Sequence, residues 1–111
     1  MNSLQLAHAW LDCFYGKRPL MEMADLLADG LVFEGPLYQF DSKQAYLDSL
    51  RADPPVGLDY RILDEFVRED VVCIIYQFIK PGMTTTMAQT FSVVDDKITA
   101  IRLVFDSRPF F

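Results

Sequence analysis

Residues 71–94 have the sequence VVCIIYQFIKPGMTTTMAQTFSVV, and this stretch decides the fold. Its two halves, 71–80 and 84–94, are rich in β-branched and aromatic residues, which favour strands. Between them, Lys80-Pro81-Gly82 is typical of a tight turn. Two long strands joined by a short turn run antiparallel, so the stretch predicts a β-hairpin.

The turn signals Arg68-Glu69-Asp70 and Asp95-Asp96-Lys97 separate this hairpin from a further strand-forming run on each side. Four successive strands with short turns predict an antiparallel meander. Two shorter strands are expected before the meander. The expected strands are 31–34, 38–40, 57–66, 71–80, 84–94 and 97–106.

The first half of the chain is predicted to be helical. Leu4, Ala7 and Leu11 recur at the spacing of one helix face. Pro19 suits the first turn of a second helix, and Asp41 is a candidate N-cap of a third. The expected helices cover 3–15, 19–28 and 42–52.

Helices followed by a meander are the pattern of the α+β class. The sequence therefore predicts a curved antiparallel sheet packed against three N-terminal helices, an α+β cone. The 111 residues suffice for one domain, which we expect to span 1–111.

Composition argues against several classes of partner. The net charge is −6, and the ten Lys and Arg residues are scattered, whereas a nucleic-acid or anionic membrane surface needs a cationic face. No apolar run approaches the roughly 20 residues of a membrane helix. The start Met1-Asn2-Ser3 lacks the basic region of a signal peptide, so a cytoplasmic protein is predicted.

The sequence also predicts no metal site and no cofactor. His8 is the single histidine, and we expect it to pair with Asp12 one turn later on an exposed helix face. Cys13 and Cys73 lie in apolar surroundings without a histidine partner, which favours buried thiols. No Gly-rich phosphate-binding loop is present.

Alternation along the strands assigns their residues to two faces. The face with the large side chains should pack against the helices. It contains one polar residue, Gln89, whose buried amide needs a ligand or a neighbour such as Tyr76, Trp10 or water to bond to. The inward set is Val72, Ile74, Tyr76, Phe78, Met87, Gln89, Phe91, Val93, Ile101, Leu103 and Phe105.

The opposite face is also largely apolar, which is unusual for a face in water. A second copy of the chain packed sheet to sheet is the simplest cover, so a homodimer is predicted. The alternative is a smaller patch, diluted by threonines, Ser92 and Arg102. The apolar residues assigned to this face are Val71, Cys73, Ile75, Ile79, Ile98, Ala100 and Val104.

Two segments carry a family resemblance. LADGLVFEGPL at 27–37 resembles the helix-to-first-strand signature of SnoaL-like proteins, and DDKITAIRLVF at 95–105 resembles their closing hairpin and last strand. SnoaL-like proteins belong to the nuclear-transport-factor-2-like (NTF2-like) superfamily. It includes ketosteroid isomerase, polyketide cyclases, limonene epoxide hydrolase, dehydratases and non-catalytic modules, so the resemblance implies a fold more than a function.

The resemblance to ketosteroid isomerase implies that the catalytic aspartates are replaced. The position of the general base falls on Gly35, and the two oxyanion-donor positions fall near Trp10 and on Gln89. An indole and an amide donate hydrogen bonds but do not abstract protons. The Arg68-Glu69-Asp70 turn likewise gives no support for the Asp-Arg-Asp arrangement of the epoxide hydrolase.

Glu34 is the only carboxylate beside the base position. Strict alternation turns it away from the pocket, while a bulge before Pro36 would turn it inward, raise its pKa and make it a weak candidate base. The tail, Ser107 to Phe111, either plugs the pocket mouth, adds to the dimer contact or is disordered.

Three functions stay open: a binder of a small hydrophobic ligand, an acid–base enzyme acting on a hydrophobic carbonyl substrate, and a dimeric assembly module. The first is favoured. Its predicted ligand-binding residues are Trp10, Phe14, Phe33, Tyr76, Met87, Gln89, Phe91, Ile101, Leu103 and Phe105.

Overall fold

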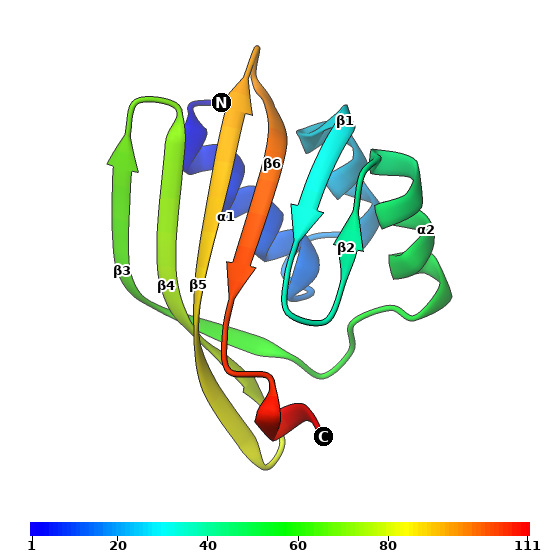
Figure 1. Ribbon diagram of the computed structural model, residues 1–111, viewed down its shortest axis with the longest axis vertical. Coiled ribbons are helices and arrows are strands. Elements are labelled where there is room, and N and C mark those ends of the chain that lie inside the picture. The colour runs from blue at the N-terminus through cyan, green and yellow to red at the C-terminus, as the bar shows by residue number, and fades with distance from the viewer.

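The computed structural model describes residues 1–111 and has an open, curved sheet with helices on its concave face (Figure 1). The helical elements are α1 (Ser3–Phe14), the 3-10 helix η1 (Leu20–Leu26), α2 (Lys43–Ala52) and a short 3-10 turn η2 (Arg108–Phe110). The strands are β1 (Leu27–Glu34), β2 (Gln39–Phe40), β3 (Asp59–Arg68), β4 (Val71–Lys80), β5 (Met83–Val94) and β6 (Lys97–Val104).

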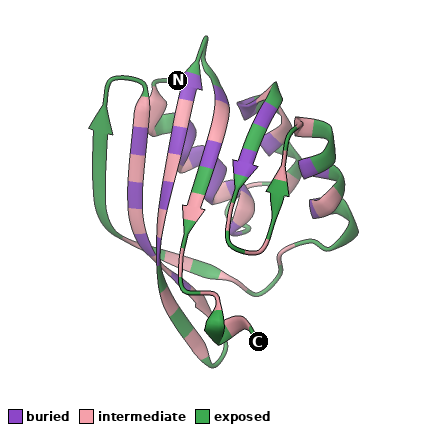
Figure 2. Cartoon of the chain, viewed as in Figure 1, coloured by how far each residue is buried: buried purple, intermediate pink, exposed green.

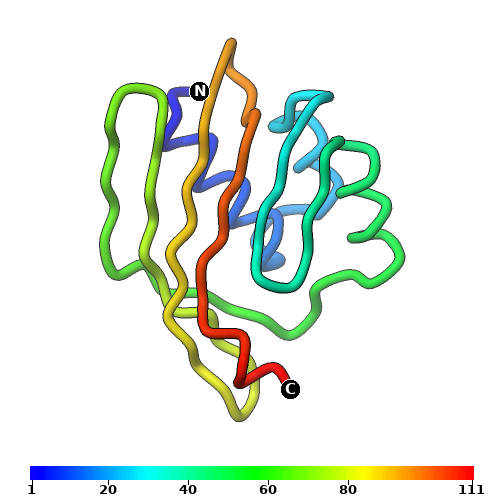
Figure 3. The backbone as a smooth tube through the Cα atoms, in the orientation of Figure 1, coloured from blue at the N-terminus to red at the C-terminus, as the bar shows by residue number.

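The sheet has the order β2-β1-β6-β5-β4-β3. The predicted meander β3 to β6 is present, with every neighbouring pair antiparallel. In addition, β1 pairs with β6 in parallel, with Phe33 opposite Ile101, so the sheet is mixed. The backbone path in Figure 3 shows how the chain passes from β2 through α2 and back across the molecule to begin β3.

Helix ends follow local capping chemistry. Asn2 and Gln5 form a capping box at the start of α1, each side chain accepting from the other's backbone N–H. In α2 the cap is Ser42, whose hydroxyl oxygen accepts from the N–H of Ala45, so the prediction of Asp41 as N-cap was wrong by one residue.

The predicted second helix was also too long. Residues 20–26 form a 3-10 helix, and the chain is already a strand at Leu27, four residues before the predicted start of β1. Pairing of Leu27 with Ile98 of β6 explains the early start, because ladder pairing and full burial outweigh the local helical pattern.

Helix α1 runs across the concave face of the sheet and contacts β4, β5 and β6 (Figure 1). The residues of β4 and β5 that were predicted to face inward are all buried, and Figure 2 shows the resulting bands along both strands. In β6, Ile101 is buried, while Leu103 and Phe105 beyond it are half-buried. Edge strand β3 is mostly exposed, with a bulge between Ile62 and Asp64.

One residue of the predicted outer face lies elsewhere. Ile98 is fully buried in the core, not on the convex face with Ala100. The pairing of β5 with β6 shifts between Ser92 and Val93, which leaves Thr99 as an extra residue between Ala100 and Ile98. Such a bulge moves the following side chain to the other face, so Ile98 and Ile101 both point inward.

No helix is long and apolar enough to cross a membrane. The cytoplasmic location stays a prediction from the sequence.

Candidate functional site

A cavity of about 430 Å³ opens where the inner face of the sheet extends beyond α1. The end of α1, helix α2, the loops 35–38 and 53–55 and the C-terminal segment form its other walls. Of its 23 lining residues 16 are hydrophobic, and these include four tyrosines. Its size lies within the range of about 300–1,000 Å³ that is usual for small-molecule pockets.

Seven of the ten predicted ligand-binding residues line this cavity: Trp10, Phe14, Phe33, Tyr76, Met87, Leu103 and Phe105. Their role in binding stays a prediction. Gln89, Phe91 and Ile101 do not line it, because they lie deeper in the core; the ring of Phe91, for example, packs edge-on against Trp10 of α1 at 5.7 Å. Alternation identified the inward face correctly but did not show which part of it α1 covers.

The closed end of the cavity is the part lined by the buried residues Trp10, Tyr15, Tyr46 and Tyr76. A chain of hydrogen bonds runs through it. The Tyr15 hydroxyl donates to the Tyr76 oxygen at 3.2 Å, and the Tyr76 hydroxyl donates to Oε1 of Gln89 at 2.7 Å. Gln89 is fully buried, and its partner is Tyr76, one of the neighbours expected from the sequence. The amide carbonyl is thereby satisfied by the protein, while its Nε2 has no protein acceptor.

Aromatic stacking holds two further side chains with polar groups at this end, Trp10 and Tyr46. Trp10 stacks on Phe14 with ring centroids 5.1 Å apart, and Tyr46 of α2 stacks on Phe33 at 5.0 Å. Both Trp10 and Tyr46 line the cavity and are almost completely buried. Neither the indole Nε1 nor the Tyr46 hydroxyl has a hydrogen-bond partner in the protein.

Burial raises the pKa of Tyr15, Tyr46 and Tyr76 well above the ordinary tyrosine value. All three phenols therefore keep their protons near neutral pH and act as neutral donors. Burial raises the pKa of the Cys13 thiol too, which fits its predicted role as a buried packing residue.

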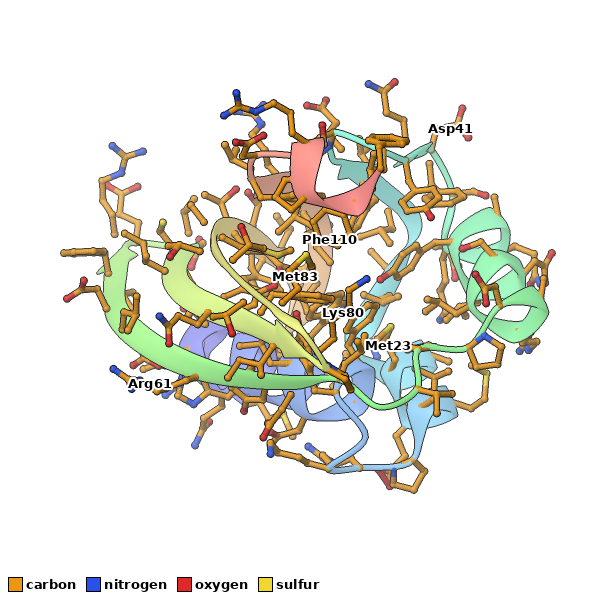
Figure 4. All side chains as sticks on the ribbon, turned by 90° about the horizontal axis from the view of Figure 1, so that it is seen from below. Met23, Asp41, Arg61, Lys80, Met83 and Phe110 are labelled. Atoms are coloured by element: carbon orange, nitrogen blue, oxygen red, sulfur yellow. The ribbon has the colours of Figure 1, made fainter.

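The mouth of the cavity differs from its closed end. Lys80 and Asp53 are its two charged lining residues. The Lys80 ammonium lies 5.4 Å from the ring centroid of Phe110, and both side chains lie at the end of the molecule drawn in Figure 4. Phe110 packs edge-on against Phe105 and Phe78, so this part of the tail covers the rim, whereas Phe111 is 93% exposed.

Glu34 is not in the cavity. It is opposite Arg102 in the parallel β1–β6 pair, and their side chains form an exposed ion pair at 3.5 Å. No bulge reverses the strand before Pro36, because Phe33 and Glu34 remain in register with both neighbours. The inward orientation required of a catalytic base is therefore absent, and Gly35 lines the cavity in its place.

His8 also has a different partner from the one predicted. Its Nε2 contacts the Glu65 carboxylate of β3, while Asp12 accepts a hydrogen bond of 2.7 Å from the Tyr60 hydroxyl. Helix spacing alone cannot show that the exposed side of α1 lies against the edge strand. The structure contains no cluster of three or more metal-ligating side chains.

Sequence reasoning missed the lining residues that come from two loops, and Lys80 at the end of β4. Segments 35–38 and 53–55 both reach the cavity, and both contain prolines that follow the end of a strand or a helix. Phe110 lines the cavity as well, at the mouth where one of the three alternatives for the tail put it. No periodicity exists in such loops, so the two proline-rich breaks were the one available signal that two loops converge on a site.

No protein-family model matches the chain, and no curated protein matches it in sequence. Solved structures do. An NTF2-like protein of unknown function from Cytophaga hutchinsonii is 19% identical, with a TM-score of 0.85, over 100% of this chain and 96% of that one.

Two further structures carry functional descriptions. A candidate isomerase of the SnoaL-like family from Agrobacterium tumefaciens is 15% identical, with a TM-score of 0.74, over 94% of this chain and 97% of that one. An LEH-like epoxide hydrolase from M. tuberculosis is 20% identical, with a TM-score of 0.78, over 94% and 82% of the two chains. The predicted SnoaL-like, NTF2-like fold is thereby confirmed. Identities this low show the fold alone.

Proposed function

We propose that this protein binds a small hydrophobic molecule in the aromatic cavity. The observation that carries the proposal is the cavity itself: about 430 Å³, with 16 hydrophobic residues among the 23 that line it. An assembly module needs no such space, because its interior can be filled by its own side chains.

The lining supports binding better than catalysis. Acid–base chemistry at a carbonyl substrate needs a base within hydrogen-bond reach of the proton that it removes. The one carboxylate lining the cavity is Asp53, an exposed residue at the C-terminal end of α2, while Glu34 is turned outward into its ion pair with Arg102. Trp10, Tyr46 and Tyr76 also line the cavity, but they are neutral side chains and none of them takes a proton from a ligand.

Native mass spectrometry of freshly purified protein, followed by denaturation, tests the proposal directly. A retained small molecule that is released on denaturation supports it and gives the mass of the ligand. The single tryptophan, Trp10, lies on the cavity wall, so its fluorescence also reports added hydrophobic probes such as naphthalene derivatives.

A matched pair of variants locates the binding. Ser49 lines the cavity, whereas Gln44 is exposed on the same helix. Ser49→Phe should fill part of the space and weaken probe binding about tenfold or more, whereas Gln44→Phe should leave it unchanged. Equal affinity in both variants would place the probe outside the cavity and contradict the proposal.

We also propose that the convex face of the sheet pairs with a second copy of the chain. Half-buried Val71, Cys73, Ile75 and Ile79 lie on this face, together with Val104, which is 57% exposed. Contiguous apolar surface of this kind is uncommon on a monomer. Size-exclusion chromatography with light scattering tests the pairing, and a monomer at micromolar concentration would contradict it.

A further inference from the structure

The mouth of the cavity contains a cation without a partner. Three of the ten lysines and arginines are half-buried, namely Arg18, Lys43 and Lys80. The first two each form an ion pair with a carboxylate. Lys80 forms neither an ion pair nor a hydrogen bond, although the chain has 16 acidic residues. It is therefore the one partly buried cation whose charge is available to a ligand.

Lys80 faces the cavity because of its place in β4. It is the last residue of the strand, and alternation puts it on the same face as Tyr76 and Phe78, which also line the cavity. Figure 4, which looks onto this end of the molecule, shows Lys80 beside Met83 and Phe110. The ammonium group lies 5.4 Å from the ring centroid of Phe110, which is a cation–π distance. The ring face lies on one side of the ammonium only, so N–H donors remain for an acceptor in the cavity.

The neighbouring carboxylates do not neutralise Lys80. Asp106, just before the tail turn that covers the rim, pairs with Arg108 at 2.5 Å. Asp53 lines the cavity from the end of α2, but it is exposed and forms no ion pair with Lys80. Water screens an exposed charge more strongly than a partly buried one, so a charged group of a ligand inside the mouth responds more to Lys80 than to Asp53.

We propose that the ligand is a hydrophobic anion, whose apolar body fills the aromatic cavity and whose single anionic group, such as a carboxylate, pairs with Lys80 at the mouth. This inference rests on the proposed function of the cavity and adds the charge class of the ligand. Without Lys80, an anion in this cavity would lose its hydration and gain no counter-ion, which is strongly unfavourable. One side chain therefore accounts for the whole preference for negative charge.

Three probes that share one ring system test the inference: naphthylacetate, naphthylacetamide and naphthylethylammonium, which are anionic, neutral and cationic at neutral pH. Calorimetry should show the anion binding about tenfold more tightly than the amide of the same shape, although water solvates the carboxylate far better. This preference should shrink as salt is added, because ions screen the pair, while the affinity for the amide should not change.

Variants of Lys80 locate the preference. Lys80→Met removes the charge and keeps an unbranched apolar side chain, so it should abolish the preference for the anion. It should leave the affinity for the amide intact, which also shows that the variant is folded with its cavity open. Lys80→Arg keeps the charge and should retain most of the preference.

Arg61→Met is the matched control, because it changes the net charge by the same amount. Arg61 is exposed on β3, and Figure 4 shows it away from Lys80. This variant should bind the anion and the amide as the unaltered protein does.

The other outcomes separate the two proposals. If the amide binds at least as tightly as the anion, the anionic class is overturned while the hydrophobic cavity is supported. Tightest binding of the ammonium probe, lost in Asp53→Asn, overturns the inference in favour of a cationic ligand. A preference for the anion that survives Lys80→Met overturns it too, because the anion is then recognised elsewhere. If no probe binds, the proposed function fails and the inference fails with it.

Discussion

The two faces of the β4–β5–β6 sheet have similar apolar character in sequence but very different surroundings. On the concave face, Ile74, Tyr76 and Phe91 are at most 1% exposed beneath the helices. On the convex face, their chain neighbours Cys73 and Ile75 are half-buried, and no other element covers them. Alternation therefore gives the face of a residue, whereas helix placement decides whether that face is core, cavity or open surface.

The largest expected difference between the faces appears at high pH. Burial raises the pKa of Tyr15, Tyr46 and Tyr76 in the folded state, while an unfolded tyrosine titrates near pH 10. The folded protein therefore holds these protons more tightly, so its stability is full below about pH 10 and falls as the pH rises further. With three such groups, the free energy of unfolding falls by about 4 kcal/mol for each pH unit, which is enough to unfold a domain of ordinary stability within a few pH units.

Circular dichroism and tyrosinate absorbance, followed together, measure this loss. The two signals should change in a single transition above pH 10, and Tyr76→Phe should make the loss of stability less steep. Full ionisation of the tyrosines while the circular dichroism remains native would contradict the buried, inward placement of these phenols.

Ile74 and Ile75 offer a matched test, because they are the same residue at adjacent positions on opposite faces. Ile74→Ala should lower the free energy of unfolding by about 2–5 kcal/mol, since Ile74 is completely buried. Ile75→Ala should lower the free energy of unfolding by about 1 kcal/mol in a monomer, because Ile75 is only half-buried. Urea denaturation measures both, and equal losses would mean that the convex face is covered as completely as the concave one.

The sequence predicts the face of a residue where local periodicity sets it, and fails where pairing with a distant strand sets it. The meander, the inward set of β4 and β5 and the first helix follow from local periodicity, and the structure has them. Ile98 was assigned to the wrong face because a bulge at Thr99 is a property of the β5–β6 pairing and leaves no mark in the periodicity. The early start of β1 and its parallel partner β6 likewise depend on residues about seventy positions away.

The candidate site was predictable to the same extent. Six of the seven predicted lining residues lie on helices and strands, where spacing indicates the inward face, whereas Phe110 and the proline loops reach the cavity only through the path of the chain. Tyr46 lies on α2, the third of the predicted helices. Its stack on Phe33 depends on the packing of α2 against β1, which no helix pattern specifies.

A smaller effect tests whether the convex face is covered by a second copy. Val104→Asp places a charge where the side chain is 57% exposed, so a monomer should tolerate it within about 0.5 kcal/mol. A sheet-to-sheet dimer should instead weaken at least about tenfold, or about 1.4 kcal/mol, because the carboxylate would be buried.

Val56→Asp is the matched control, since Val56 is 82% exposed in the loop before β3. Analytical ultracentrifugation should show dissociation for Val104→Asp alone. A dimer that survives this substitution would place the contact on another surface.

The smallest effect is expected at Glu34, on the convex side of the β1–β6 pair. Its ion pair with Arg102 spans 3.5 Å between side chains that are 51% and 68% exposed, and exposed pairs contribute little. Glu34→Gln should therefore change the free energy of unfolding by less than about 0.5 kcal/mol. It should also leave the affinity for a hydrophobic naphthalene probe unchanged, because Glu34 does not line the cavity.

Ser49→Phe is the counterpart of Glu34→Gln on the concave side, since Ser49 lines the cavity whereas Glu34 lies outside it in an exposed ion pair. If the cavity is the binding site, the serine variant loses affinity for a hydrophobic probe and the glutamate variant does not. The reverse result, with Glu34→Gln impairing binding or turnover of a carbonyl compound, would require β1 to rearrange so that its outward carboxylate reaches the cavity, and would restore the acid–base enzyme over the binder.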